Sequence, residues 1–246
     1  MSALSSLCEY ESNSEESDCD TKPPKYKKLR LPDLSAIPVF STEKYVDNCE
    51  LHSGRIRSFP HVRGNWASFV YIQYTGEENF LNLINKLQTQ LSDIDEPCFK
   101  CDDFHISLSK TIVLQYHLIT SFTSSLQTIL SNTGSFKLLF DTVKIYCNEE
   151  NTRTFIALEV DHSSNKYLLN ITDKIDNILK EYKLPTFYEN PSFHMSILWI
   201  NGNKKTKLTN ILDKLNNILL HKNLAPICIS KVNCKIGNKY FQYSLI

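Results

Sequence analysis

The stretch Phe104-His105-Ile106-Ser107-Leu108 is repeated later in the chain as Phe193-His194-Met195-Ser196-Ile197. Each copy reads aromatic, histidine, apolar, serine, apolar. If each copy forms a β-strand, alternate side chains point to opposite faces, so the apolar residues share one face and the histidine and serine share the other. A single histidine on a strand is most often structural, but two matching copies predict a functional site on the histidine and serine face.

The segments around the two copies repeat in the same order. In the first half we expect strands and helices at 67–74 (strand), 77–94 (helix), the His105 strand, 115–130 (helix), 136–141 and 143–148 (strands). In the second half we expect them at 154–160 (strand), 165–182 (helix), the His194 strand, 205–220 (helix), 227–235 and 240–245 (strands). Matching segments are separated by nearly the offset of the two histidines, which predicts a duplicated lobe.

This pattern predicts an α+β fold of two lobes related by a pseudo-twofold axis, with antiparallel sheets lining a central cleft and helices outside. Such an axis would bring the two histidine strands side by side. Both histidine and serine faces would then line one cleft.

Residues 1–48 differ from the rest in composition. Serine and acidic residues are followed by the basic cluster Lys25 to Arg30 and by further prolines, which predicts a disordered tail. The cluster fits a nuclear-import signal or an RNA-facing arm, although such runs are usually only solvated. Residues 49–246 are expected to form a single bilobal domain.

Composition limits the class of protein. Lys and Arg number 27, as do Asp and Glu, so any affinity for nucleic acid must come from local basic clusters. The chain shows no apolar run of about 18 residues and no signal-peptide order, so we expect an intracellular protein without a membrane partner. The eight cysteines are scattered, which argues against a disulfide framework.

The sequence offers little for a metal ion. Cys98-Phe-Lys-Cys101 is a lone CxxC that could be half of a zinc site or a redox pair, but no second pair accompanies it. Asp102 and Asp103 are the only carboxylates close to either repeat. We therefore expect chemistry without a metal ion or cofactor.

Two histidine and serine pairs suit phosphodiester cleavage in RNA. Imidazole titrates near neutral pH, so one copy can accept the proton of an attacking 2'-hydroxyl while the other donates a proton to the departing 5'-oxygen. Hydroxyl groups such as those of Ser107 and Ser196 would donate hydrogen bonds to the phosphate oxygens.

The repeated His-Xaa-Ser strands resemble those of the 2H phosphoesterase superfamily. Three stretches resemble, more specifically, the family of U6 small nuclear RNA phosphodiesterases: Gly54-Arg-Ile-Arg-Ser-Phe-Pro-His-Val-Arg-Gly-Asn-Trp66, His105-Ile-Ser-Leu-Ser109 with Val113-Leu114, and Phe187-Tyr188 leading to Pro191-Ser-Phe-His194. The resemblance covers roughly residues 50–246. Ile197-Leu198 before Trp199 departs from the more usual Leu-Ala, and nothing before about residue 50 matches.

The resemblance implies a nuclear, metal-independent 3'-to-5' exoribonuclease that trims the 3' oligouridine tail of U6 spliceosomal RNA and leaves a 2',3'-cyclic phosphate. It implies that His105 and His194 are the acid–base pair, that Ser107 and Ser196 bind phosphate, and that Tyr188 stacks on a nucleobase of the substrate. We favour His194 as the base and His105 as the acid. A monomer that binds the uridine-rich 3' end of U6 RNA is expected.

Several alternatives remain open from the sequence. Arg55, Arg57 and Arg63, with His61, could contact RNA phosphates or could brace a loop. Tyr188 could be an ordinary half-buried tyrosine. The same site would also suit a 2',3'-cyclic nucleotide phosphodiesterase or another RNA-end-processing 2H enzyme. A non-catalytic RNA-binding module is the least favoured reading.

Overall fold

A computed structural model describes residues 62–92, 96–222 and 224–246. These residues all belong to one compact unit, Arg57–Ile246. The predicted tail at 1–48 and its basic cluster lie outside the described residues, as do Arg55, Arg57 and His61. The expectations for those segments therefore stay predictions.

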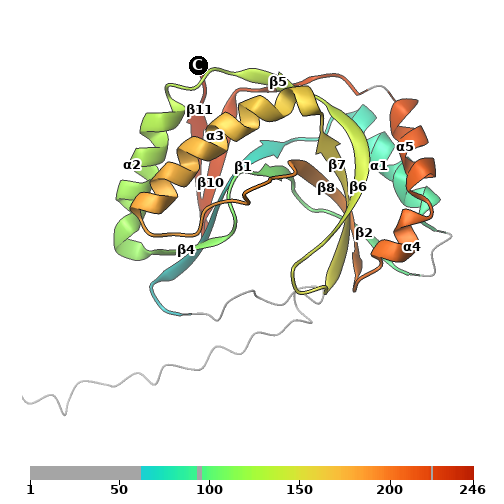
Figure 1. The fold of residues 1–246 in the computed structure, drawn as a ribbon, viewed down its shortest axis with the longest axis horizontal. Coiled ribbons are helices and arrows are strands. Elements are labelled where there is room, and N and C mark those ends of the chain that lie inside the picture. The colour runs from blue at the N-terminus through green and yellow to red at the C-terminus, as the bar shows by residue number, and fades with distance from the viewer. Residues whose placement is uncertain (1–61, 93–95, 223) are drawn as a thin grey trace, which may run out of the picture. The chain divides into compact units, whose positions relative to one another are not determined.

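One antiparallel sheet dominates the described part of the chain (Figure 1). Its main path runs β11-β10-β1-β3-β8-β7-β6, with β4 added beside β1 and β2 beside β8. The strands are β1 Asn65–Tyr74, β2 Cys98–Lys100, β3 Phe104–Ser107, β4 Ile112–Gln115, β6 Phe140–Cys147, β7 Arg153–Val160, β8 His194–Asn201, β10 Lys231–Ile236 and β11 Lys239–Ser244. Two short strands, β5 Phe136–Leu138 and β9 Ile227–Ile229, pair with each other separately.

The helices pack in two groups. They are α1 Glu78–Gln90, the 3-10 turn η2 Tyr116–Leu118, α2 Ile119–Leu130, α3 His162–Glu181, α4 Lys205–Thr209 and α5 Leu212–Leu220. Helix α3 begins where Asp161 accepts a hydrogen bond from the backbone N–H of Ser163, and it buries an apolar stripe at helical spacing. Helices α2 and α3 pack together, and so do α1 and α5 (Figure 1).

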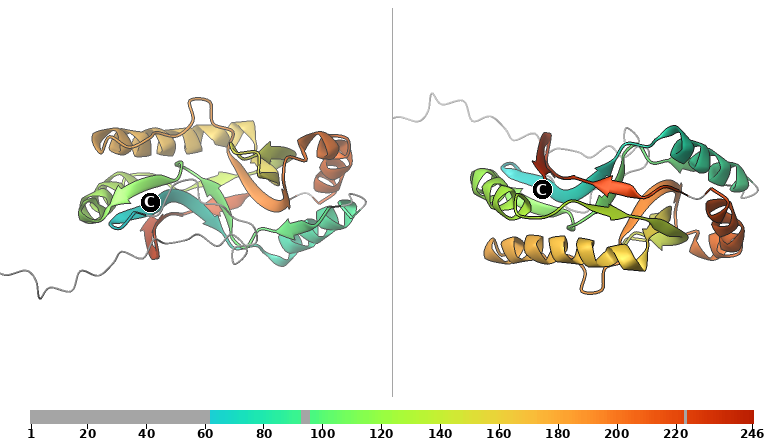
Figure 2. Two further views of the ribbon diagram at one scale, coloured as in Figure 1. Left: turned by 90° about the horizontal axis from the view of Figure 1, so that it is seen from below. Right: turned by 90° about the horizontal axis from the view of Figure 1, so that it is seen from above.

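Each half of the sheet draws on both halves of the chain. The half with β1 and β3 is completed by β10 and β11 from the C-terminal end, and α2 packs against β11. The half with β7 and β8 is completed by β6, and α1, α4 and α5 pack against its strands. Figure 2 shows the two helix groups apart from each other. The predicted lobes therefore exist, but the two sequence repeats exchange elements to build them.

Alternating burial separates a core face from a site face. In β1, Ser68, Val70 and Ile72 are buried, while the residues between them lie on the face that carries the histidines. In β8 the pairing with β7 shifts by one residue between Ile156 and Ala157. Such a bulge changes which side chains share a face.

Some predicted boundaries are wrong. The helix expected at 205–220 is divided into α4 and α5 at Asn210 and Ile211. The strand expected at 227–235 is divided at Ser230 because β9 pairs with β5 whereas β10 pairs with β1. Strand β5 likewise ends at Leu138, before β6 begins. The sequence reading missed β2 and β4 altogether.

Candidate active site

The two histidine strands are neighbours at the centre of the sheet. Ile106 of β3 pairs with Met195 of β8 in an antiparallel register. Continuing that register places His105 opposite Ser196 and Ser107 opposite His194. Ile106 and Met195 themselves are buried on the core face, with 3% and 0% of their surfaces exposed. The repeat therefore brings both predicted histidines and both predicted serines to one face around a local twofold axis.

Both imidazoles are held in the same way. The Nδ1 atom of His105 lies 3.2 Å from the carbonyl oxygen of Asp103, and Nδ1 of His194 lies 2.7 Å from the carbonyl oxygen of Ser192. A carbonyl oxygen only accepts hydrogen bonds, so Nδ1 carries a proton in both rings. In the neutral ring Nε2 is then the atom that can accept a proton from a substrate.

Burial lowers the pKa of both histidines below the ordinary value, because it disfavours the charged imidazolium. The hydrogen-bonded carbonyls act in the opposite direction and raise both pKa values. Asp103 also raises the pKa of His105, while Lys235 lowers it. Glu159 raises the pKa of His194, and the charge of His105 lowers it. The charge of His105 therefore affects the pKa of His194, and each imidazole has different charged neighbours.

His194 contacts a small cluster of polar and aromatic side chains. The ring of Tyr146 stacks on the imidazole with centroids 3.8 Å apart and an angle of 14° between the planes. The Tyr146 hydroxyl lies 2.7 Å from the hydroxyl of Ser192, which donates to Glu159 at 2.9 Å. Lys144 in turn pairs with Glu159 at 2.6 Å. Ser192 therefore holds His194 through its carbonyl and holds Tyr146 and Glu159 through its hydroxyl.

His105 has aromatic neighbours of another kind. The Tyr71 ring meets the imidazole edge-on with centroids 5.7 Å apart, and Phe69 lies at 5.9 Å with its plane tilted by 45°. Neither neighbour stacks in parallel as Tyr146 does. The two histidines are therefore related by symmetry in their backbone and differ in their surroundings.

The serine hydroxyls face the same surface and are half-buried. Among the residues that the structure describes, neither Ser107 nor Ser196 has a hydrogen-bond partner for its side chain. Donor hydroxyls on both sides of the histidines suit the binding of phosphate oxygens.

Tyr188 lies in the loop between α3 and β8 and is 48% exposed. Its hydroxyl donates to Glu149 at 3.4 Å, and the ammonium of Lys110, just after β3, lies 4.3 Å from its ring centroid. The loop after α3 and the loop after β3 thus meet at this ring. Of the predicted arginine segment, only Arg63 falls within the described residues, and it is exposed.

In the described ranges, no three His, Cys, Asp or Glu side chains are grouped to hold a metal ion. Burial raises the pKa of the Cys98 thiol to about 11, so the thiol stays protonated and is a poor ligand and nucleophile. No helix in this part of the chain has the length and apolarity to cross a bilayer.

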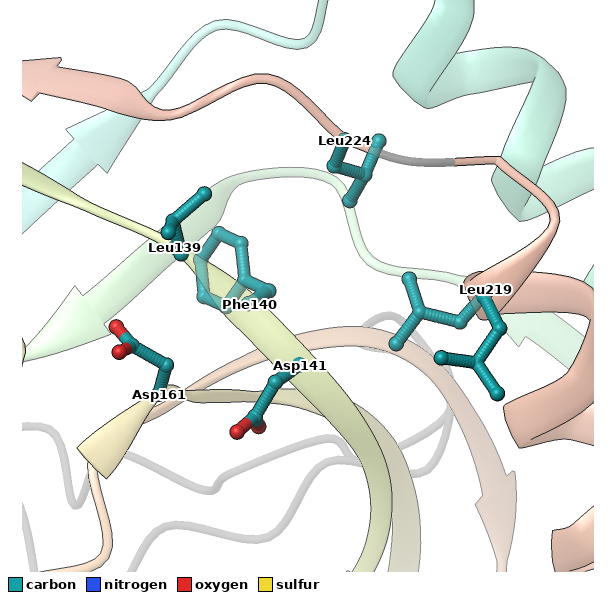
Figure 3. Close-up of a pocket in the computed structure, with 7 residues that line it drawn as sticks. Leu139, Phe140, Asp141, Asp161, Leu219 and Leu224 are labelled. Carbon is teal, nitrogen blue, oxygen red and sulfur yellow. The ribbon is translucent and has the colours of Figure 1, made fainter. Parts of the chain in front are cut away.

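One cavity in the described part is lined by neither His105 nor His194 (Figure 3). It has a volume of about 410 Å³ and is lined by Leu139, Phe140, Asp141, Asp161, Leu219, Leu220 and Leu224. Five of its seven lining residues are apolar, and none of the seven comes from the two His-Xaa-Ser strands.

The sequence reading missed Tyr146, Ser192 and Glu159. Ser192 stands two residues before His194, as Asp103 stands before His105, and that repeated spacing could have indicated the shared backbone bond. Tyr146 and Glu159 carry no local signal, because pairing of β6, β7 and β8 brings them to the histidine.

Solved structures share this architecture. Usb1 of Kluyveromyces marxianus superposes with a TM-score of 0.57 at 13% identity, covering 74% of this chain and 99% of that chain. Its structure with uridine monophosphate superposes with a TM-score of 0.53. The chain therefore has the fold of these structures, with the two His-Xaa-Ser strands side by side at its centre.

Sequence relatives make the family specific. A family model named HVSL, described as "Uncharacterised conserved protein", matches residues 30–244. U6 snRNA phosphodiesterase 1 of Danio rerio is 39% identical over 210 residues, which is 83% of this chain and 76% of the relative. The Homo sapiens protein of that name is 37% identical over 204 residues, or 81% and 77% of the two chains. The chain therefore belongs to the U6 snRNA phosphodiesterase 1 family.

Proposed function

We propose that this protein is a metal-independent 3'-to-5' exoribonuclease that trims the 3' oligouridine tail of U6 small nuclear RNA in the nucleus and leaves a 2',3'-cyclic phosphate. The observation that carries the proposal is the pairing of His105 and His194 on one face, each with Nδ1 held by a carbonyl. The names of the relatives support the substrate. All four site residues come from one chain, which supports action as a monomer.

In this proposal Nε2 of His194 accepts the proton of the 2'-hydroxyl as O2' attacks phosphorus. The bond to the 5'-oxygen breaks, and that oxygen takes a proton from Nε2 of His105. Ser107 and Ser196 donate hydrogen bonds to the non-bridging phosphate oxygens. The negative charge of the bound phosphate favours the protonated form of one imidazole, which offsets the effect of burial on its pKa.

The charge beside His194 supports its assignment as the base. Glu159 raises the pKa of His194 and so stabilises the imidazolium that forms when His194 accepts a proton. At His105, Asp103 raises the pKa and Lys235 lowers it, so the charges beside this ring oppose each other. The role of His105 as the acid therefore rests on the assignment of His194 as the base.

The test is incubation of RNA with a 3' oligouridine tail in the presence of EDTA. Wild-type protein should shorten the RNA stepwise, and His105→Ala or His194→Ala should each reduce the rate by at least about 100-fold. His221→Ala, at an exposed histidine outside the site, is the matched control and should retain the rate. A 2'-deoxyribose at the reacting nucleotide should block cleavage.

Mass spectrometry of the shortened RNA identifies the new 3' end. A cyclic phosphate supports transesterification, whereas a free 3'-hydroxyl would overturn the mechanism. Loss of activity in EDTA would overturn its independence from metal ions. Turnover of 2',3'-cyclic mononucleotides without shortening of RNA would favour the cyclic phosphodiesterase instead. RNA binding without product, unchanged by either histidine substitution, would indicate a non-catalytic module.

A further inference from the structure

A row of three side chains leads from His105 to the edge of the sheet. The register between β1 and β10 pairs Phe69 with Lys235, and the register between β10 and β11 pairs Lys235 with Tyr240. Residues paired in this way point to the same face of a sheet. Phe69 contacts His105, so the row lies on the face of the active site.

The outer two residues of the row, the half-buried Lys235 and the exposed Tyr240, form a cation and aromatic pair. The Lys235 ammonium lies 5.0 Å from the centroid of the Tyr240 ring. Tyr240 is 66% exposed, so one of its ring faces is available to a ligand. The effect of Lys235 on the pKa of His105 shows that its charge reaches the active site. A positive charge and an open aromatic ring therefore stand beside the histidines.

The other half of the sheet offers no such pair. Counting outward from His194, the strand equivalent to β10 is β6, and its site-face residues Lys144 and Tyr146 are both engaged. Lys144 is neutralised by Glu159, and Tyr146 stacks on His194. Within the described residues Lys235 has no carboxylate partner. The cation of this row is thus available to a phosphate.

The chemistry of the proposed reaction indicates which part of the RNA substrate Lys235 and Tyr240 would contact. The departing 3'-terminal nucleoside carries no phosphate beyond the scissile one. A free cation next to the histidine pair can therefore meet only phosphates of the retained chain, which also supplies further bases. Single-stranded nucleic acid is commonly bound by basic side chains that follow the backbone and by aromatic rings on which bases stack.

We propose that Lys235 and Tyr240 form a subsite for the single-stranded RNA that precedes the scissile linkage. The Lys235 ammonium pairs with a backbone phosphate, and a base stacks on Tyr240. This subsite deepens the proposed function and rests on it. It explains how a protein with balanced net charge grips an RNA chain near its reacting end.

The experiment compares two substrates. The dinucleotide UpU has only the scissile phosphate, whereas pentauridylate extends into the subsite. Lys235→Ala should lower kcat/KM for pentauridylate roughly fivefold more than it lowers kcat/KM for UpU, because any effect through the pKa of His105 is common to both substrates. Tyr240→Ala should lower kcat/KM for pentauridylate roughly fivefold or more. Lys166→Ala is the matched control, because Lys166 lies at the same 5.0 Å from the ring of Tyr167 on α3.

Binding is measured separately with pentauridylate that carries 2'-O-methyl groups and cannot react. Loss of one phosphate contact should reduce the slope of log Kd against log salt by about 0.7 in Lys235→Ala. Wild-type affinity and slope in Lys235→Ala and Tyr240→Ala would overturn the subsite, as would equal losses on UpU and pentauridylate. Failure of the wild-type protein to cleave either substrate would instead overturn the proposed function, and the binding measurement would still decide the subsite.

Discussion

Replacing Tyr146 tests whether its stack holds His194 in position for catalysis. The Tyr146 and His194 rings are 3.8 Å apart and nearly parallel, which is close contact for two flat rings. Pairs of this kind are worth about 0.5–1.5 kcal/mol beyond the area they bury. If the stack orients the imidazole for proton transfer, its loss raises the barrier by that amount. Tyr146→Leu should therefore lower kcat about 2- to 13-fold and change KM little.

Tyr146→Phe separates the ring from the hydroxyl. It keeps the stack and loses only the 2.7 Å contact with Ser192, so kcat should fall by about twofold. The assay is steady-state cleavage of oligouridine RNA over a range of substrate concentrations, which gives kcat and KM. Tyr167→Leu is a matched control, because Tyr167 stacks on Phe136 at an angle of 13° away from the site. A wild-type kcat in Tyr146→Leu, or an equal loss in Tyr167→Leu, would refute the positioning role.

Two further predictions concern stability. Gly237 has φ +57°, and an added Cβ would lie 2.2 Å from the Trp66 ring. Gly237→Ala should therefore lower the free energy of unfolding, measured by urea titration, by about 2 kcal/mol or more. Gly134→Ala is the control, because a Cβ at Gly134 meets nothing within 4 Å. Because burial lowers the pKa of His105 and His194, the unfolded chain binds more protons than the folded one as pH falls below about 6.5. Thermal stability should therefore fall on acidification through that range, and a double His→Asn variant that melted with the same pH dependence would contradict this.

The site face could be read from the sequence because its signal is local. A period of two places His105 and Ser107 on one face and Ile106 on the other, and the structure has this alternation. The repeat of the phrase then predicted that β3 and β8 lie together, which their register confirms. A pattern of this kind can be recognised in the sequence from a few residues of one strand.

The surroundings of the histidines could not be read in this way. Lys235 reaches His105 only because β10 pairs with β1, and the two strands are far apart in the sequence. Periodicity describes one segment at a time and does not specify its partner. The division of the helix expected at 205–220 could not be predicted either, because Leu208, Leu215 and Leu219 keep helical spacing across the break. Strand β2, with 3 residues, is too short to show a period.

In the proposed mechanism the different neighbours of the two histidines allow a near-symmetric site to carry out an asymmetric reaction. Transesterification needs one imidazole that gains a proton and one that loses it. Backbone carbonyls hold both rings in the same way, but their neighbours differ: Glu159 of β7 lies beside His194, whereas Lys235 of β10 and Asp103 both act on His105. Glu159 favours the state in which His194 holds the proton, while Lys235 and Asp103 act on the pKa of His105 in opposite directions. Opening the cyclic phosphate would start from the state in which His194 holds the proton, with His194 donating to O2' and His105 activating water, so the charge of Glu159 that favours the first step also prepares His194 for a second.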